Sequence, residues 1–338
     1  MIAVLIGIIA GAVSTVQASV NNRVREINGS PYTTALLNFI AAGTVLVAII
    51  LVMEHELYLP VRAIAQHPFW IWCGGVCGAT IVTLNVICLP KLGSARNVMI
   101  ICFAQVMTGL VIDHFGLFYS TRVPMTVMRT AGAVLVLTGT LMVNGIRFGR
   151  PDSSATPGGS HGVMRTDDAS ADEADEVAGA SAGDAPYVIL ALICGFACSA
   201  QIAFNGALRE VTESAAKATL ISMMGGFITA LLVIALITIF KGKNGIYDDP
   251  VSGRPSYRFR LSMFLGGILA VIVVGGNAII ADTLSTGLVT ILNLIGMMGA
   301  GLAIDAAGFL GIEKKPVTAV KVTGMLLMTG GTAMISLI

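Results

Sequence analysis

Charged side chains are scarce in this chain of 338 residues, because Asp, Glu, Lys and Arg together make up only 12%. A soluble domain carries about twice that share. Hydrophobic residues reach 55% and the mean hydropathy is +0.86. So little charge excludes nucleic-acid binding, disorder and a fibrous fold for the chain as a whole. The composition indicates an integral membrane protein.

Sequence motifs of enzymes and metal sites are missing as well. No GxSxG, HExxH or Walker A segment occurs, and of the four histidines only His114 adjoins a hydrophobic span. The six cysteines lie in apolar runs without a CxxC pair, so we expect no disulfide, no metal and no cofactor. Cys73/Cys77 and Cys194/Cys198 have a spacing that two metal ligands could use, but no histidine or carboxylate joins them. The favoured interpretation of these thiols is small apolar filler.

Ten hydrophobic stretches are long enough to cross about 30 Å of hydrocarbon. They cover residues 2–22, 31–53, 68–89, 94–112, 124–144, 187–208, 218–240, 261–281, 286–304 and 316–337. The sequence therefore predicts an all-α integral membrane protein with ten transmembrane helices. No basic segment precedes the first stretch, so we expect a retained helix there and not a signal peptide.

The segment 145–186 interrupts this pattern with Gly, Ser, Ala, Pro and acidic residues. Such a composition cannot bury enough apolar area to fold alone. We predict a disordered acidic linker between a first domain, 1–144, and a second, 187–338.

The two domains repeat one another in sequence. Gln17 and Asn21 recur as Gln201 and Asn205, an offset of 184 residues (201 − 17). Later motifs recur at an offset of 192 residues (305 − 113), and these are Gly109, Asp113, Gly116, Asn85, Pro124, Gly132 and Gly139 against Gly301, Asp305, Gly308, Asn277, Pro316, Gly324 and Gly331. The difference falls in a single loop, because 241–260 is longer than 54–67. Five predicted helices per copy make the second copy enter the membrane from the opposite side, which gives two inverted repeats.

Lys and Arg residues are distributed unevenly between the two predicted membrane faces. Of the 20 such residues, only Arg62, Arg122, Arg129, Arg209 and Lys217 belong to the side that carries the chain termini. The other fifteen lie on the side of the linker. The positive-inside rule then places the linker in the cytoplasm and both termini outside.

Amide side chains within the spans are costly in hydrocarbon unless they face a partner or a water-filled cavity. Gln17 and Asn21 share one helix face with Ser14. The candidate substrate-binding amides are Gln17, Asn21, Asn38, Asn85, Gln105, Gln201, Asn205, Asn277 and Asn293. Two interpretations stay open, a cavity that binds substrate or hydrogen-bonded contacts between helices.

Each copy also carries an acid and a base in register. Asp113 with Arg129, and Asp305 with Lys321, predict structural ion pairs that join two helix ends, with proton coupling as the alternative. Pro124 and Pro316 predict the first position of the helices that carry the bases. The glycine pairs 132/139 and 324/331 predict close helix packing.

The first copy resembles the YdcZ-like branch of the drug/metabolite transporter superfamily. The resemblance rests on Gln17-x3-Asn21, Gly29-Ser30-Pro31, Leu89-Pro90-Lys91-Leu92-Gly93, Gln105, Asp113-His114-Phe115-Gly116 and Pro124-x4-Arg129-x2-Gly132, and it extends over both halves. It implies five-helix units, here fused in one chain, that move small molecules across the bacterial cytoplasmic membrane. Met297 replaces Gln105 in the second copy, so we expect an asymmetric cavity. Gln17 stands where the related small multidrug resistance proteins carry their proton-coupling glutamate, so proton antiport is not implied.

Together these features predict a secondary transporter, and not an enzyme. The expected activity is export of a small polar or amphipathic metabolite by alternating access at the repeat interface. The alternative is a non-transporting membrane protein, either an intramembrane enzyme that acts on lipid or a scaffold. The expected partners are a small-molecule substrate and the lipid bilayer, with no nucleic acid. A monomer is expected because one chain holds both repeats.

Overall fold

Ten α-helices account for most of the chain that the computed structural model describes, which is residues 1–55, 57, 62, 65–92, 94–143, 185–241, 261–281, 283–307 and 318–336. They are α1 (Ile2–Asn28), α2 (Pro31–Met53), α4 (Gly74–Leu92), α5 (Ser94–Phe115), α6 (Val127–Val143), α8 (Ala185–Thr212), α9 (Ala215–Lys241), α10 (Leu265–Ile280), α11 (Thr286–Ala307) and α12 (Ala319–Ser336). Short 3-10 turns add η1 (Phe69–Cys73), η2 (Leu117–Tyr119) and η5 (Leu261–Phe264). Apart from its last two residues, the predicted linker 145–186 lies outside the described residues.

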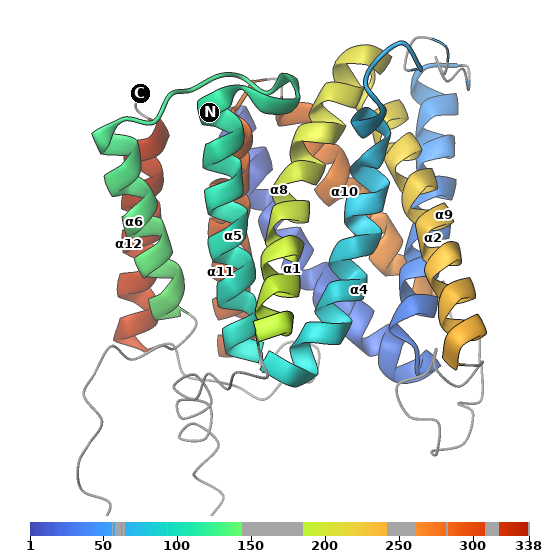
Figure 1. Ribbon diagram of the computed structural model, residues 1–338, viewed down its shortest axis with the longest axis horizontal. Helices are drawn as coiled ribbons and strands as arrows, with labels where there is room; N and C mark the ends of the chain where they lie inside the picture. Colours follow the sequence, from blue (N-terminus) through green and yellow to red (C-terminus); the bar gives the residue numbers. More distant parts are fainter. Residues whose placement is uncertain are drawn as a thin grey trace, which may run out of the picture.

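The helices run up and down beside one another (Figure 1). The two chain termini lie at the upper side in this view, whereas α6 ends and α8 begins at the lower side. The pair α6 and α12 stands at one edge of the molecule, and α2 and α9 stand at the opposite edge.

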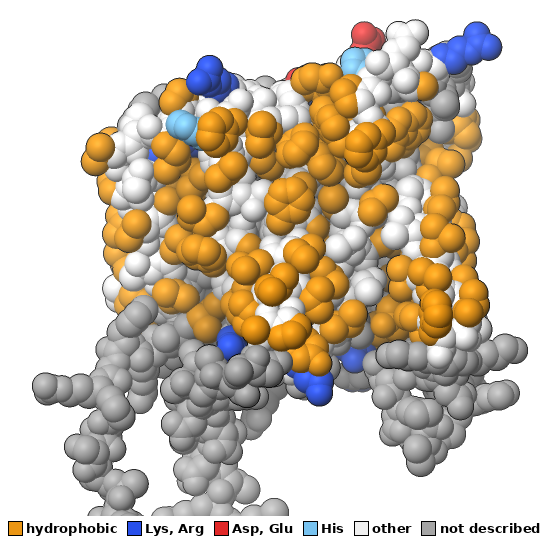
Figure 2. All heavy atoms as spheres, in the orientation of Figure 1, with side chains coloured by type: hydrophobic (Ala, Val, Ile, Leu, Met, Phe, Trp, Pro, Cys, Tyr) orange, Lys and Arg blue, Asp and Glu red, His pale blue; other side chains and the backbone are white. Residues whose placement is uncertain are grey.

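The length and composition of the helices suit a membrane. In the described part of the chain, seven helices are long and apolar enough to span one. Three shorter apolar helices, Phe69–Asn85, Val127–Val143 and Leu265–Ile280, accompany them. Hydrophobic side chains cover the visible face in Figure 2, while Lys and Arg gather at its upper and lower edges. The protein is therefore an all-α membrane protein that crosses the bilayer several times; the predicted total of ten crossings stays a prediction.

A three-residue turn reverses the chain between α1 and α2. Gly29 ends α1 in the left-handed region (φ 68°), which costs a residue without Cβ little, and its N–H bonds to the carbonyl of Arg25. Ser30 then caps α2, because its side chain accepts the N–H of Thr33 at 3.2 Å. Pro31 takes the first helical position, where its missing N–H is not needed.

The start of α6 differs from the prediction. The helix begins at Val127 and not at Pro124, because Thr126 provides the cap: its Oγ1 accepts the N–H of Arg129 at 3.2 Å. A hydroxyl satisfies a free N–H group of the first turn, which proline cannot do. Thr318 does the same for Lys321 at the start of α12, at 3.4 Å. Arg129 and Lys321 consequently lie in the first turns of their helices.

Helices of each half pack mainly against helices of the other half. The long helix α1 contacts α10 and α11, and α8 contacts α4 and α5. At the edges of the molecule, α2 packs against α9 and α6 packs against α12. The largest buried core lies among α5, α6, α11 and α12, where Val106, Val136, Ile291, Leu294 and Met328 have no exposed surface.

Glycines bring α6 and α12 into backbone contact. A Cβ at Gly132 would lie 2.6 Å from the carbonyl oxygen of Gly331, and one at Gly139 would lie 2.4 Å from that of Gly324. Real Cβ atoms do not approach an oxygen so closely, so only glycine fits these positions. Because 132 pairs with 331 and 139 with 324, the two helices run antiparallel. The glycine pairs thus serve close packing, as their spacing predicts.

Candidate functional site

Asn21 of α1 and Asn38 of α2 form a side-chain pair beside the start of α10. Asn38 donates through Nδ2 to Oδ1 of Asn21 at 2.9 Å. A Cβ at Gly266 would lie 2.1 Å from Oδ1 of Asn21 and 2.5 Å from Oδ1 of Asn38. Both amides therefore press against a glycine that leaves room for them. The structure brings these two predicted residues together in a contact that joins three helices.

The second half contains the matching contact. A Cβ at Gly74 would lie 2.1 Å from Oδ1 of Asn205 and 3.0 Å from Oγ of Ser222. Gln201 adds a hydrogen bond, because its Nε2 donates to the carbonyl oxygen of Gly74 at 3.1 Å. Ser222 was not among the predicted residues. Its register could have found it, because it follows Asn38 by the repeat offset of 184 residues (222 − 38).

Asn85 of α4 is held by several neighbours. Its Nδ2 donates to the carbonyl oxygen of Ile81 at 3.1 Å and contacts Sγ of Cys194 at 3.5 Å. Its Oδ1 accepts from Nδ2 of Asn97 at 3.1 Å. These contacts connect α4, α5 and α8. Asn97 was missed because it lies near a predicted helix start, where an amide is unremarkable.

Four predicted amides keep polar atoms without a protein partner. In the described part of the chain, the side chains of Gln17 and Gln105 make no hydrogen bond, although Gln17 is half-buried and Gln105 is buried. There too, Oδ1 of Asn277 and Oδ1 of Asn293 are buried without a partner. Buried amides are normally satisfied by protein or water. These four side chains are therefore the best placed of the nine predicted amides to contact a ligand.

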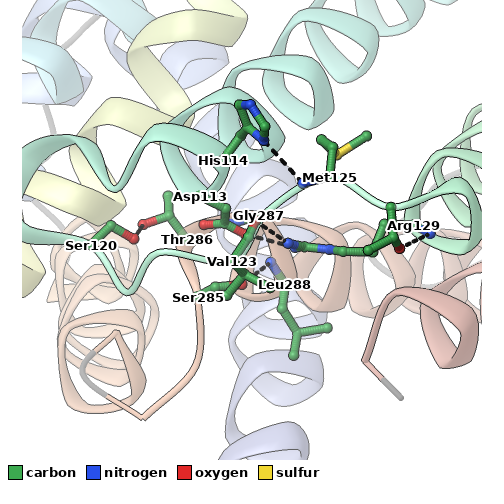
Figure 3. A network of polar contacts seen from close by, with 11 residues as sticks. Asp113, His114, Ser120, Val123, Met125, Arg129, Ser285, Thr286, Gly287 and Leu288 are labelled. Carbon is green, nitrogen blue, oxygen red and sulfur yellow. Dashed lines mark hydrogen bonds and ion pairs between the residues drawn. The ribbon is translucent and has the colours of Figure 1, made fainter. Parts of the chain in front are cut away.

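Asp113 and Arg129 form a buried ion pair where α5 ends and α6 begins (Figure 3). Nη2 of Arg129 lies 3.0 Å from Oδ2 of Asp113, and both side chains are almost fully buried. Arg129 also donates through Nη1 to the carbonyl oxygen of Val123 at 2.6 Å. The other carboxylate oxygen of Asp113 accepts the N–H of Gly287, the second residue of α11, at 3.0 Å.

This arrangement removes an electrostatic cost that the sequence predicts for Asp113. The acid lies near the C-terminal end of α5, where the helix dipole disfavours a negative charge. The same carboxylate meets the N-terminal end of α11, where free N–H groups favour it. Hydroxyls of Ser120 and Thr286, 2.8 Å apart, add a second link to α11. Sequence reasoning anticipated Arg129 as a partner but missed α11.

The structure says less about the corresponding pair in the second half. Lys321 lies in the first turn of α12, and Asp305 lies near the end of α11. The side chain of Asp305 is outside the described part of the chain, so its pairing with Lys321 stays a prediction.

A further ion pair, not predicted, joins the end of α2 to the start of α9. Nζ of Lys217 lies 2.6 Å from Oε2 of Glu54, and the hydroxyl of Ser214 donates to Oε1. Burial raises the pKa of Glu54, but the hydrogen bonds from Lys217 and Ser214 and the charge of Lys217 outweigh it, so the pKa lies below its ordinary value. Thr238 and Thr33 occupy the matching positions of the other copies, so the pair has no counterpart.

Metal-ligating side chains do not cluster anywhere in the described ranges, where no three His, Cys, Asp or Glu residues could hold an ion together. The six cysteines are free thiols.

The model of one protein family covers both halves of the chain. It is described as "Putative inner membrane exporter, YdcZ", and it matches residues 2–142 and 186–334. The chain belongs to this family. YdcZ proteins are thus classed as exporters of the inner membrane, and the apolar helices of this member agree with a multi-pass protein there.

The likeness to solved structures supports the fold of this YdcZ-family chain. One crystal structure, described only as that of a protein, shares 18% sequence identity with it and a TM-score of 0.62. The match covers 99% of this chain and 96% of the other. No curated protein matches the chain. The functional class therefore comes from the YdcZ family, and the structural likeness shows the fold alone.

Proposed function

We propose that this chain is a secondary transporter that exports a small polar or amphipathic metabolite, with access that alternates between two inverted five-helix repeats. Membership of the YdcZ family supports the exporter class. On this proposal all ten α-helices cross the membrane, including the three shorter apolar ones.

The observation that carries this proposal is an exchange of contacts between the halves. Thr15 of α1 donates to the carbonyl oxygen of Met297 on α11 at 3.1 Å. Ser199 of α8 donates to the carbonyl oxygen of Gln105 on α5 at 2.6 Å. Positions 15 and 199 differ by 184, and positions 105 and 297 differ by 192, which are the two repeat offsets. Each repeat therefore makes to its partner the contact that the partner makes to it.

Close backbone approaches obey the same exchange. A Cβ at Gly11 would lie 2.0 Å from the carbonyl oxygen of Asn293, and one at Gly195 would lie 2.4 Å from that of Ile101. The pairs 11/195 and 101/293 again differ by the two offsets. Together with the antiparallel pair α6 and α12, this supports a two-fold relation between inverted halves, the geometry that rocking-type transporters use.

The amides without partners support a polar substrate contact between the repeats. Gln17 lies on α1 and Gln105 on α5, whereas Asn277 and Asn293 lie on α10 and α11 of the other repeat. A metabolite with donors and acceptors would satisfy groups that the protein leaves open. Asn21, Asn38 and Asn205 serve helix packing on this proposal, because glycines receive them.

The same proposal places the linker in the cytoplasm and the two termini outside. The basic residues favour this orientation. The end of α6 and the start of α8, which border the linker, lie at the face opposite to both termini (Figure 1), in agreement with it.

Transport in reconstituted vesicles tests the proposal. Vesicles with and without the full chain are offered a panel of labelled metabolites, and we expect at least one compound to cross only where the protein is present. Gln17→Leu and Gln105→Leu should then each lower its rate by about tenfold, since each loses a hydrogen bond to the substrate. Thr44→Leu is the matched control, because Thr44 is exposed and its hydroxyl bonds only within α2, to Ile40.

The results separate two failures. If no compound crosses faster than in protein-free vesicles, the transporter proposal is wrong. If one crosses but both glutamine variants behave like the control, the substrate binds elsewhere in the molecule.

A further inference from the structure

An apolar groove of about 360 Å³ opens among α1, α2, α9 and α10. Its lining consists of Ile6, Ile9, Ala10, Leu46, Ile49, Ala215, Ala216, Thr219, Val271, Ile272, Gly275, Gly276 and Ile279. Thr219 is the polar member of the lining, and its hydroxyl donates to the carbonyl oxygen of Ala215 within α9. A ligand in this groove would therefore meet hydrocarbon along its whole length.

The groove lies in one half of the membrane. Its walls are the first turns of α1 and α9 and the last turns of α2 and α10, which all lie near the face that carries the chain termini. The lining residues are within ten positions of those helix ends, which corresponds to a depth of at most about 15 Å. That depth equals half of a hydrocarbon core about 30 Å thick. The groove is therefore open to the acyl chains of a single leaflet.

Two glycines make room for the groove. A Cβ at Gly275 would meet only Oγ1 of Thr219, at 3.7 Å, and one at Gly276 would meet Ile6 at 3.5 Å. The matching positions of the first repeat, 192 residues earlier, hold Thr83 and Leu84, whose side chains occupy such space. The groove thus belongs to one side of the two-fold arrangement, as does the ion pair described next.

Opposite charges stand at the outer end of the groove. Lys217 follows the lining residue Ala216 on α9, and Glu54 follows the last turn of α2. They form the 2.6 Å ion pair, and their side chains keep 12% and 27% of their surface exposed. An ammonium and a carboxylate that are side by side at the membrane surface are complementary to a head group that carries both signs. An anionic head would meet Glu54, and a cationic one would meet Lys217.

We propose that the groove binds an alkyl chain of a zwitterionic phospholipid from this leaflet, with Lys217 facing the phosphate and Glu54 facing the ammonium group of the head. This is a binding site separate from the unpartnered amides, and it does not depend on transport activity.

Photolabelling of the full chain in detergent micelles tests the site. The probe is lysophosphatidylethanolamine with a diazirine in its alkyl chain, and labelled positions are read by mass spectrometry. We expect labels on Ile9, Ile49 and Ile272, and competition by unlabelled lysophosphatidylethanolamine. Gly275→Leu fills the groove and should lower the labelling by about tenfold, since most of the buried chain loses its place.

Two variants keep this result interpretable. Gly330→Leu on α12 is the matched control, because nothing lies within 4 Å of its Cβ position, and it should label like the parent. Gly275→Ala adds a single methyl group at ordinary contact distance and should give an intermediate loss, so a folding defect of the leucine variant does not decide the outcome.

Head-group preference tests the charges. Probes with the same chain but an anionic carboxylate head or a cationic trimethylammonium head should label about threefold less than the zwitterionic probe, as expected for a partly exposed charge pair. Glu54→Gln and Lys217→Met should each remove this preference. Equal labelling by all three probes, or labelling that Gly275→Leu leaves unchanged, would mean ordinary boundary lipid and overturn the proposal.

Discussion

The carboxylate of Asp113 serves two elements at once, the guanidinium of Arg129 and the first turn of α11. A buried ion pair adds little net stability when it is intact, since desolvation of both groups offsets their attraction. Its loss is costly, because the remaining charge stays buried without a partner. The residue is therefore better understood as a fastening between three helices than as a carrier of protons.

Asp113→Asn should lower the free energy of unfolding by about 3–5 kcal/mol, because it leaves the Arg129 guanidinium buried and uncompensated. Addition of Arg129→Met should restore most of this loss, since it removes the stranded charge. Reversible unfolding in mixed micelles measures both effects. A single variant as stable as the parent would contradict the fastening role.

An exchange of the two charges separates the contributions of Arg129 and α11. Arginine at 113 would place a positive charge against the N-terminal end of α11, where the helix dipole disfavours it. We therefore expect the exchanged protein to be less stable than the neutral double variant, even though its ion pair can form.

At the scale of elements, α6 and α12 depend on glycine for their contact. Gly331 faces the carbonyl oxygen of Gly132, with 2.5 Å between that oxygen and an added Cβ, whereas nothing lies within 4 Å of the neighbouring Gly330. The same helix thus offers a crowded and an open glycine one residue apart.

Gly331→Leu should lower stability by about 1–3 kcal/mol, because a large side chain in a filled interface forces the helices apart. Gly330→Leu should lie close to the parent, since its side chain points into open space. Thermal unfolding of the two variants under identical conditions gives the comparison. Equal midpoints would show that the glycine contact does not hold α6 to α12.

At the scale of the whole molecule, the proposed orientation makes a direct prediction. A phosphatase reporter fused near residue 165 should be inactive, because the linker is cytoplasmic, and one fused after Ile338 should be active. The count of basic residues is the physical reason. Activity at the first site and none at the second would reverse the orientation, while leaving the fold unchanged.

The sequence predicted the helical class, the ten helices and the family because long apolar runs and registered repeats are properties of the chain itself. It could not separate packing amides from open ones. Asn21 and Gln17 look alike in sequence, and only the position of Gly266, more than 200 residues away, shows that Asn21 is received by another helix. The contact of Asp113 with Gly287, and the ion pair of Glu54 with Lys217, likewise depend on how distant helices meet.

The packing of α1 has a consequence for biogenesis. Its main neighbours, α10 and α11, are among the last helices to leave the ribosome, and 282 residues separate Thr15 from its bonding partner Met297. At about 5–20 residues per second, synthesis of that interval takes roughly 15 to 60 s. During this time α1 resides in the bilayer with its glycine-bearing face against lipid or an insertion factor. The first helix to enter the membrane is thus among the last to reach its final contacts, and premature pairing of the first five helices with another nascent chain is the error that the cell must prevent.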